Sequence, residues 1–119
     1  MILQFQSFID NEIIKDYKIS YQKDDNKIIF NDDETNDEFV IEINDKSLNI
    51  SRSGDIKMKF KFILNKKTHG LYELMGNIYH FDIETTLIDI KDEYINLIYK
   101  MKDNTNKISN HKINIHFNI

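Results

Sequence analysis

Residues 56–62 read Ile-Lys-Met-Lys-Phe-Lys-Phe, with an apolar side chain at every even position and lysine between them. Successive side chains of a β-strand point to opposite faces, so this period of two predicts a strand with one buried and one wet face. The alternation recurs along the chain at these apolar positions: Tyr17, Ile19, Tyr21; Phe39, Ile41, Ile43; Tyr79, Phe81, Ile83; Ile95, Leu97, Tyr99, Met101; and Ile113, Ile115, Phe117, Ile119. The chain therefore reads as an antiparallel sheet.

Turn-forming residues separate these segments. Asn and Asp, which tolerate a left-handed backbone, cluster at 10–11, 24–26, 36–37, 44–45, 65–67, 91–92 and 103–106. Gly76-Asn77 has the chemistry of a tight hairpin loop. Because no helix is expected to cover the sheet, its apolar face must pack on itself, and closure also removes exposed edges. We predict an all-β fold, a single closed or nearly closed antiparallel barrel of about eight to ten strands over residues 1–119.

Composition bounds the class of protein. A chain of 119 residues fits one domain, and a hydrophobic content of 40% argues against disorder. Cysteine is absent, so neither disulfides nor thiol chemistry is available. The N-terminus lacks the features of a signal peptide, and no apolar run approaches the roughly 20 residues of a membrane span. The net charge of −4 argues against nucleic acid and anionic membranes as main partners. We expect a bacterial-type cytoplasmic protein.

Several segments resemble a known family in order and spacing. They are 47–54 with its Arg52-x-Gly54 motif, Gly70-Leu71-Tyr72-Glu73 with Gly76, 81–87, 95–99 and 111–115. Over residues 12–117 the sequence is similar to the YwiB-like family of small bacterial proteins. The resemblance implies a calycin-like or lipocalin-like β-barrel. It brings no catalytic residue and no established function.

The single arginine, Arg52, is the first candidate for a functional residue. It shares the parity of Leu48 and Ile50, so its guanidinium is expected to point toward the barrel interior. A buried arginine has to be paired, because an isolated buried charge costs several kcal/mol. Its planar fork suits the carboxylate or phosphate of a ligand held inside the barrel.

The other candidates are aromatic and acidic side chains. Inward-facing tyrosines can line a pocket and orient a ligand through their hydroxyls, so the candidate ligand site contains Arg52, Tyr72, Glu73, Tyr79 and Tyr99. The structural alternative is a filled core in which Arg52 pairs internally with Glu73 or Glu84, or stacks on Tyr72 or Tyr99.

The remaining motifs give no sign of catalysis. There is no nucleophile elbow, phosphate loop or dinucleotide fingerprint, so we expect no enzyme and no cofactor. The four histidines lack metal-site spacing, and His80, Asp82 and Glu84 have the parity of a water-facing surface, so we expect no metal. The acidic stretch 32–38 is expected to be a solvated hairpin end. The lysines of 57–67 are expected to keep a strand soluble, with weak nucleic-acid binding as the other interpretation.

Two functions from different classes remain. The first is a non-catalytic barrel that binds a small, mostly apolar molecule, with Arg52 anchoring an anionic head. The alternative is a structural or protein-interaction barrel with a filled core, which meets another protein or a second copy of itself in a homodimer. Four apolar residues that lean outward would serve that contact: Ile63, Ile88, Ile90 and Ile98.

Overall fold

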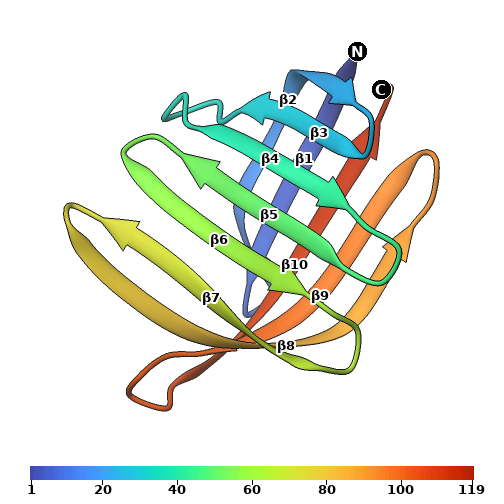
Figure 1. The fold of residues 1–119 in the computed structure, drawn as a ribbon. Helices are drawn as coiled ribbons and strands as arrows, with labels where there is room; N and C mark the ends of the chain where they lie inside the picture. The colour runs from blue at the N-terminus through green and yellow to red at the C-terminus, as the bar shows by residue number, and fades with distance from the viewer.

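The computed structural model describes residues 1–119 as an all-β barrel (Figure 1). Its strands are β1 (Ile2–Ile9), β2 (Glu12–Asp24), β3 (Lys27–Asn31), β4 (Glu38–Ile43), β5 (Leu48–Ser53), β6 (Ile56–Phe62), β7 (Lys67–Leu74), β8 (Asn77–Ile90), β9 (Tyr94–Lys102) and β10 (Ile108–Phe117). Each strand runs antiparallel to its neighbours in the chain, and β1 pairs with both β2 and β10, which closes the barrel. The predicted closed antiparallel barrel is confirmed. No helix of the chain could span a membrane.

The alternating pattern sorts side chains between the two faces of the wall. A core of 17 apolar residues faces inward, each no more than 8% exposed, whereas the lysines of β6 are exposed on the outside. Aromatic rings fill the middle of the barrel; Phe30 and Phe39 stack with centroids 5.4 Å apart, and Phe62 lies 4.7 Å from Tyr99. Each such side chain contributes roughly 1.5–3 kcal/mol of burial. Because the core side chains fill the middle of the barrel, they separate its two ends.

The wall is least regular between β6 and β7. Their pairing runs only from Ile56 opposite Leu74 to Lys59 opposite Leu71, and the strands then diverge. The chain after β6 crosses toward β8, where Leu64 forms a parallel bridge with Thr85. This crossing draws the loop 63–66 against β8 at one end of the barrel.

The tight hairpin between β7 and β8 lies one residue earlier than predicted. Its two loop residues are Met75 and Gly76, with φ angles of 53° and 81°, and Asn77 already begins β8. A two-residue hairpin loop of this twist needs positive φ at both positions. The prediction of Gly76-Asn77 failed because methionine rarely takes that conformation.

The up-and-down path gives the barrel two ends. The Arg52 end carries the turns 10–11, 32–37, 54–55, 75–76 and 103–107. The lysine end carries the turns 25–26, 44–47, 63–66 and 91–93 together with both chain termini, which lie side by side at the top of Figure 1.

Candidate functional site

Arg52 lies on the inner wall near the end of β5, with 8% of its surface exposed. Its Nε donates a hydrogen bond of 2.9 Å to Asp37 Oδ2, and its Nη2 donates one of 3.2 Å to Thr35 Oγ1. The guanidinium carbon lies 5.2 Å from the ring centroid of Phe39, its cross-strand neighbour. The arginine is therefore held on two edges and one face.

Backbone groups of the β5–β6 turn hold Asp37 from the other side. The Asp55 N–H donates to Asp37 Oδ1 at 3.2 Å, and the Ile56 N–H donates to Oδ2 at 3.4 Å. Between them and β5 lies Gly54, with φ of 152°, where an added Cβ would stand 1.9 Å from Asp37 Oδ1. The glycine is needed both for its backbone conformation and for the space that the carboxylate occupies.

A second buried carboxylate continues the same network. Asp32 Oδ1 accepts hydrogen bonds from Lys15 Nζ at 2.6 Å and from the Tyr17 hydroxyl at 3.0 Å. Its Oδ2 accepts one of 3.0 Å from the hydroxyl of Thr35, which in turn accepts from Arg52. Two cations and two carboxylates thus share one connected cluster whose formal charges cancel.

The cluster shifts the acidity of its members. Burial raises the pKa of Asp32, but hydrogen bonds from Lys15 and Thr35 outweigh it and hold that pKa below its usual range. Burial likewise raises the pKa of Asp37, and the Arg52 guanidinium with the backbone N–H of Asp55 outweighs it, so this pKa is also lowered. Both carboxyls are therefore ionised at neutral pH.

This arrangement corrects two sequence-based predictions. The stretch 32–38 is not wholly solvated, because Asp32 and Asp37 are only 2% and 4% exposed. The internal partner of Arg52 is Asp37, and neither Glu73 nor Glu84 approaches it. Both glutamates lie on the outer wall, where Glu73 is 3.9 Å from Lys57 and Glu84 is 3.9 Å from Lys67.

The candidate tyrosines occupy inner-wall positions of neighbouring strands. Arg52 stands opposite Met58, Met58 opposite Tyr72, and Tyr72 opposite Tyr79. The rings of Tyr72 and Tyr79 are 6.4 Å apart, and neither hydroxyl has a hydrogen-bond partner in the protein. The register therefore brings together Arg52, Tyr72 and Tyr79 and leaves Glu73 on the opposite face.

Tyr99 lies deeper on the inner wall, opposite Thr85 on one side and His111 on the other. Its ring stacks on His111 at 5.0 Å, and the His111 Nε2 lies 2.7 Å from the Ser109 hydroxyl. Burial lowers the pKa of His111, with Asp10 partly opposing it, so the neutral imidazole is favoured. Burial also raises the pKa of Tyr99, whose hydroxyl therefore stays protonated.

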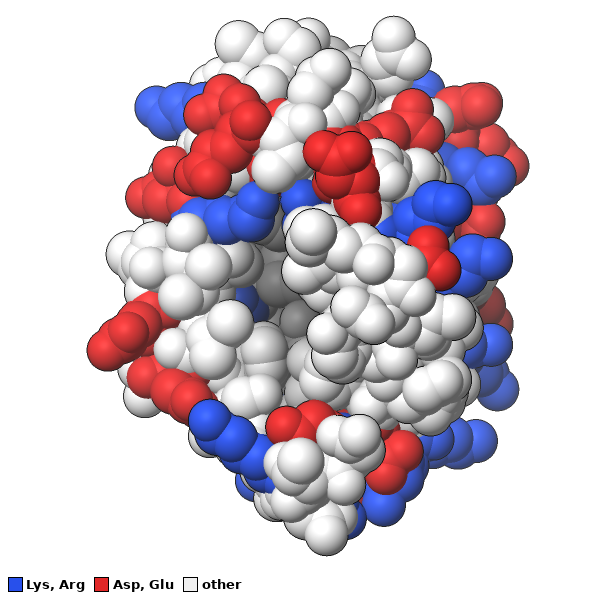
Figure 2. All heavy atoms as spheres, turned by 90° about the vertical axis from the view of Figure 1, so that its left-hand side faces the viewer, with Lys and Arg blue, Asp and Glu red and all other residues white.

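Figure 2 looks onto the Arg52 end and shows a hollow near its centre, with uncharged residues on both sides and charged residues along its upper edge. The partly buried apolar residues of the inner wall toward this end are Tyr17, Met58, Tyr72, Phe81 and Met101. Arg52 Nη1 donates no hydrogen bond to the protein and is not fully buried. The arginine therefore keeps one donor edge free at this end of the barrel.

Comparison with known proteins supports the fold. Residues 9–115 match the family described as "Domain of unknown function (DUF1934)". The crystal structure of the ywiB protein from Bacillus subtilis is similar, with a TM-score of 0.67 and 18% sequence identity over 99% of this chain and 91% of that one. No curated protein matches the sequence.

Proposed function

We propose a function for this chain, which belongs to the DUF1934 family. From the geometry of its barrel, we infer that it is a non-catalytic protein that binds a small, mostly apolar molecule with an anionic head. The molecule would enter the hollow at the Arg52 end. Its apolar body would lie against Tyr72, Tyr79 and Phe81, and its head would accept a hydrogen bond from Arg52 Nη1.

One observation carries the proposal: three polar groups on the inner wall toward the Arg52 end have donors without partners in the protein. Tyr72, Tyr99 and Arg52 each keep a donor that makes no internal hydrogen bond, and none of these donor atoms is fully buried. Because these donors are not fully buried, water can accept their hydrogen bonds in the free protein. A ligand oxygen would replace that water as the acceptor.

The internal ion pair limits the role of Arg52. Since Asp37 already balances its charge, the arginine would orient the head through one N–H edge and add little long-range attraction. The ligand would be selected chiefly by its apolar body and by hydrogen bonding to the tyrosines.

Titration with dodecanoate, followed by isothermal titration calorimetry, tests the proposal. We expect one dodecanoate per chain, with dodecanol binding more weakly because it lacks the carboxylate. Tyr72→Phe and Tyr99→Phe remove only a hydroxyl that has no protein partner, so they should weaken binding several-fold and leave the thermal midpoint unchanged. Tyr94→Phe is the matched control, because Tyr94 lies on the outer wall and donates to Asp89.

Native mass spectrometry of protein taken directly from cells gives a second readout. A retained small molecule that is lost from the Tyr99→Phe variant would support the proposal. Absence of any retained molecule, together with no heat on dodecanoate addition, would overturn it.

The competing proposal is a protein-interaction barrel that forms a homodimer. Ile98 on the outer wall is 37% exposed, which favours it, whereas Ile63, Ile88 and Ile90 gather at the lysine end. Light scattering over a range of concentrations separates the two, since a persistent monomer contradicts the homodimer. We also still expect that the protein is not an enzyme, that its barrel is calycin-like, and that it is a cytoplasmic protein of bacterial origin.

A further inference from the structure

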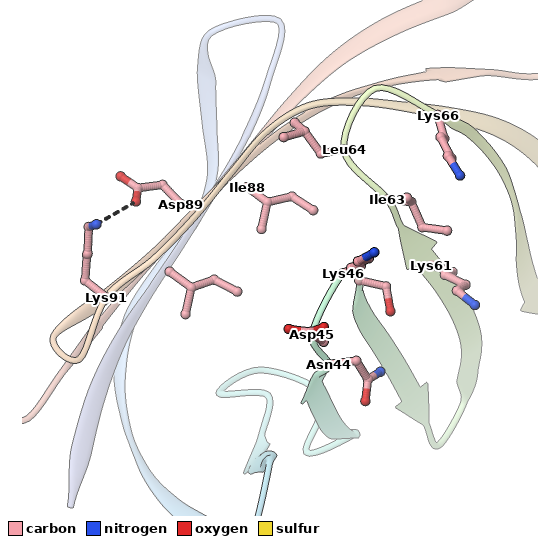
Figure 3. Close-up of a pocket in the computed structure, with 12 residues that line it drawn as sticks. Asn44, Asp45, Lys46, Lys61, Ile63, Leu64, Lys66, Ile88, Asp89 and Lys91 are labelled. Carbon is pink, nitrogen blue, oxygen red and sulfur yellow. Dashed lines mark ion pairs between the residues drawn. The ribbon is translucent and has the colours of Figure 1, made fainter.

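The lysine end of the barrel holds a pocket of about 830 Å³ that shares no residue with the Arg52 cluster (Figure 3). It lies between the end of β8 and the turns 44–47 and 63–66. Pockets that hold small organic ligands usually measure about 300–1,000 Å³, so this volume suits one such molecule.

One side of the pocket is apolar. Ile88 and Ile90 extend from the end of β8, and Ile63 and Leu64 come from the loop that crosses to β8. Figure 3 shows the Ile88 side chain directed across the pocket toward Ile63. This wall would pack against a ring or a short alkyl chain.

The other side of the pocket is cationic. Lys46, Lys61 and Lys66 border it, and none of the three forms an ion pair within the protein. Asp45 is the one unpaired acid in the lining. The second acid, Asp89, is 3.9 Å from Lys91 and accepts a hydrogen bond from Tyr94.

The orientation of that Asp89–Lys91 pair strengthens the positive character of the pocket. In Figure 3 both side chains are directed away from the space that the isoleucines face, whereas Lys46 lies closest to that space and Lys61 and Lys66 are directed outward at the opposite rim. The unpaired charges along the lining are therefore three lysines against one aspartate. Lysine ammonium groups bind phosphate as point charges, and the field of several of them adds in a partly enclosed site.

We infer that this pocket binds a compact organic anion, with an aromatic ring against Ile63 and Ile88 and a doubly charged phosphate head beside the lysines. The site is independent of the hollow at the Arg52 end, because the packed aromatic middle of the barrel lies between them. An anion with two negative charges should bind better than one with a single charge, since three unpaired lysines border the pocket and their positive fields add.

Fluorescence titration with 1-naphthyl phosphate tests the inference. We expect saturable binding of one molecule, at least tenfold tighter than that of inorganic phosphate, which lacks the ring, and of 1-naphthol, which lacks the charge. Binding should weaken as salt rises, because exposed ammonium groups are screened. 1-Naphthyl acetate, an uncharged ester, serves as a further comparison for the head.

Variants locate the site. The triple variant K46Q/K61Q/K66Q should weaken 1-naphthyl phosphate at least tenfold, whereas the matched variant K18Q/K100Q/K107Q, which removes three other exposed and unpaired lysines, should alter it less than twofold. Ile88→Asn should weaken the phosphate ester and 1-naphthol alike. Tyr72→Phe should leave 1-naphthyl phosphate unchanged, which separates this pocket from the Arg52 end.

Three results would each overturn the inference: equal affinity of the triple variant and the wild-type chain, equal affinity for inorganic phosphate and 1-naphthyl phosphate, or loss of 1-naphthyl phosphate binding in Tyr72→Phe. Since the lysines are exposed and unpaired, the triple variant should fold like the wild-type chain, and its circular dichroism spectrum verifies this.

Discussion

The two ends of the barrel use cations in opposite ways. At the Arg52 end, Arg52 and Lys15 each meet a carboxylate that is almost completely buried, Asp37 and Asp32. At the lysine end, Lys46, Lys61 and Lys66 border an open pocket without any acidic partner in contact. Buried charges have to be compensated inside the protein, whereas exposed charges are solvated by water and remain free to bind a partner from solution.

We therefore expect the Arg52 end to contribute to stability and the lysine end to contribute to binding. A neutral, fully connected cluster fixes the loops 32–37 and 54–55 against the barrel, so its removal should affect stability. Unpaired surface lysines contribute little to stability but attract anions. Substitutions at the two ends should therefore separate folding from binding, and the following predictions test that separation in order of decreasing effect.

Arg52→Leu should lower the free energy of unfolding by about 3–5 kcal/mol, because it leaves Asp37 buried without its cation. Lys61→Leu, the same change at the other end, should alter it by no more than about 0.5 kcal/mol. Urea denaturation followed by circular dichroism measures both. The double variant Arg52→Leu/Asp37→Leu should regain part of the loss, and equal losses in the two single variants would abolish the contrast.

Gly54→Ala should cost about 2–3 kcal/mol, since alanine adds backbone strain and its Cβ collides with Asp37. Gly76→Ala is the control: its φ of 81° is also positive but brings milder strain, and nothing lies within 4 Å of the added Cβ. The control should therefore cost only about 1 kcal/mol. Thermal unfolding ranks the pair, and a control that costs as much as Gly54→Ala would show that the space around Asp37 is unimportant.

Acid should destabilise the protein through the Arg52 end. Asp32 and Asp37 have pKa values below the usual range when folded, so the unfolded chain, with its ordinary pKa of about 3.9, binds more protons in that window. Their contribution is complete above the ordinary pKa and is lost as pH falls through the folded values. The measurement is the free energy of unfolding from urea denaturation at a series of acidic pH values. Asp32→Asn should make this free energy fall less steeply as the pH is lowered, whereas Lys61→Gln should leave the slope unchanged.

The sequence predicts the barrel well because its decisive signal is local. Alternation along 56–62 and its counterparts places Phe60, Ile83 and Leu97 inside, where each is no more than 6% exposed. The same parity could have identified the buried carboxylates: Asp32 continues the inward series of Ile28 and Phe30. The number of acids in that stretch suggested a solvated turn instead.

The lysine pocket could not be predicted in the same way. It depends on the chain leaving β6 early and bridging Leu64 to Thr85, twenty-one positions further along. No local pattern near Ile63 or Lys66 encodes that crossing, because the bridge joins residues that are far apart in the sequence. Of the apolar residues expected to contact a partner protein, Ile63, Ile88 and Ile90 line this pocket, and their common location depends on the long-range pairing.

The smallest predicted effect concerns Thr85, which lies on the inner wall between the two ends. Its hydroxyl is fully buried and has no hydrogen-bond partner, unlike every polar side chain of the Arg52 cluster. Thr85→Val keeps the shape and the β-branch, so removing the unsatisfied group should raise the free energy of unfolding by about 1 kcal/mol. Thr68→Val is the opposite control, because the Thr68 hydroxyl donates to the Lys61 carbonyl, and its loss should lower stability by about 1 kcal/mol. Opposite signs for these two substitutions would show that pairing, and not polarity as such, decides what a hydroxyl contributes inside this wall; a destabilised Thr85→Val would mean that its hydroxyl has an acceptor after all.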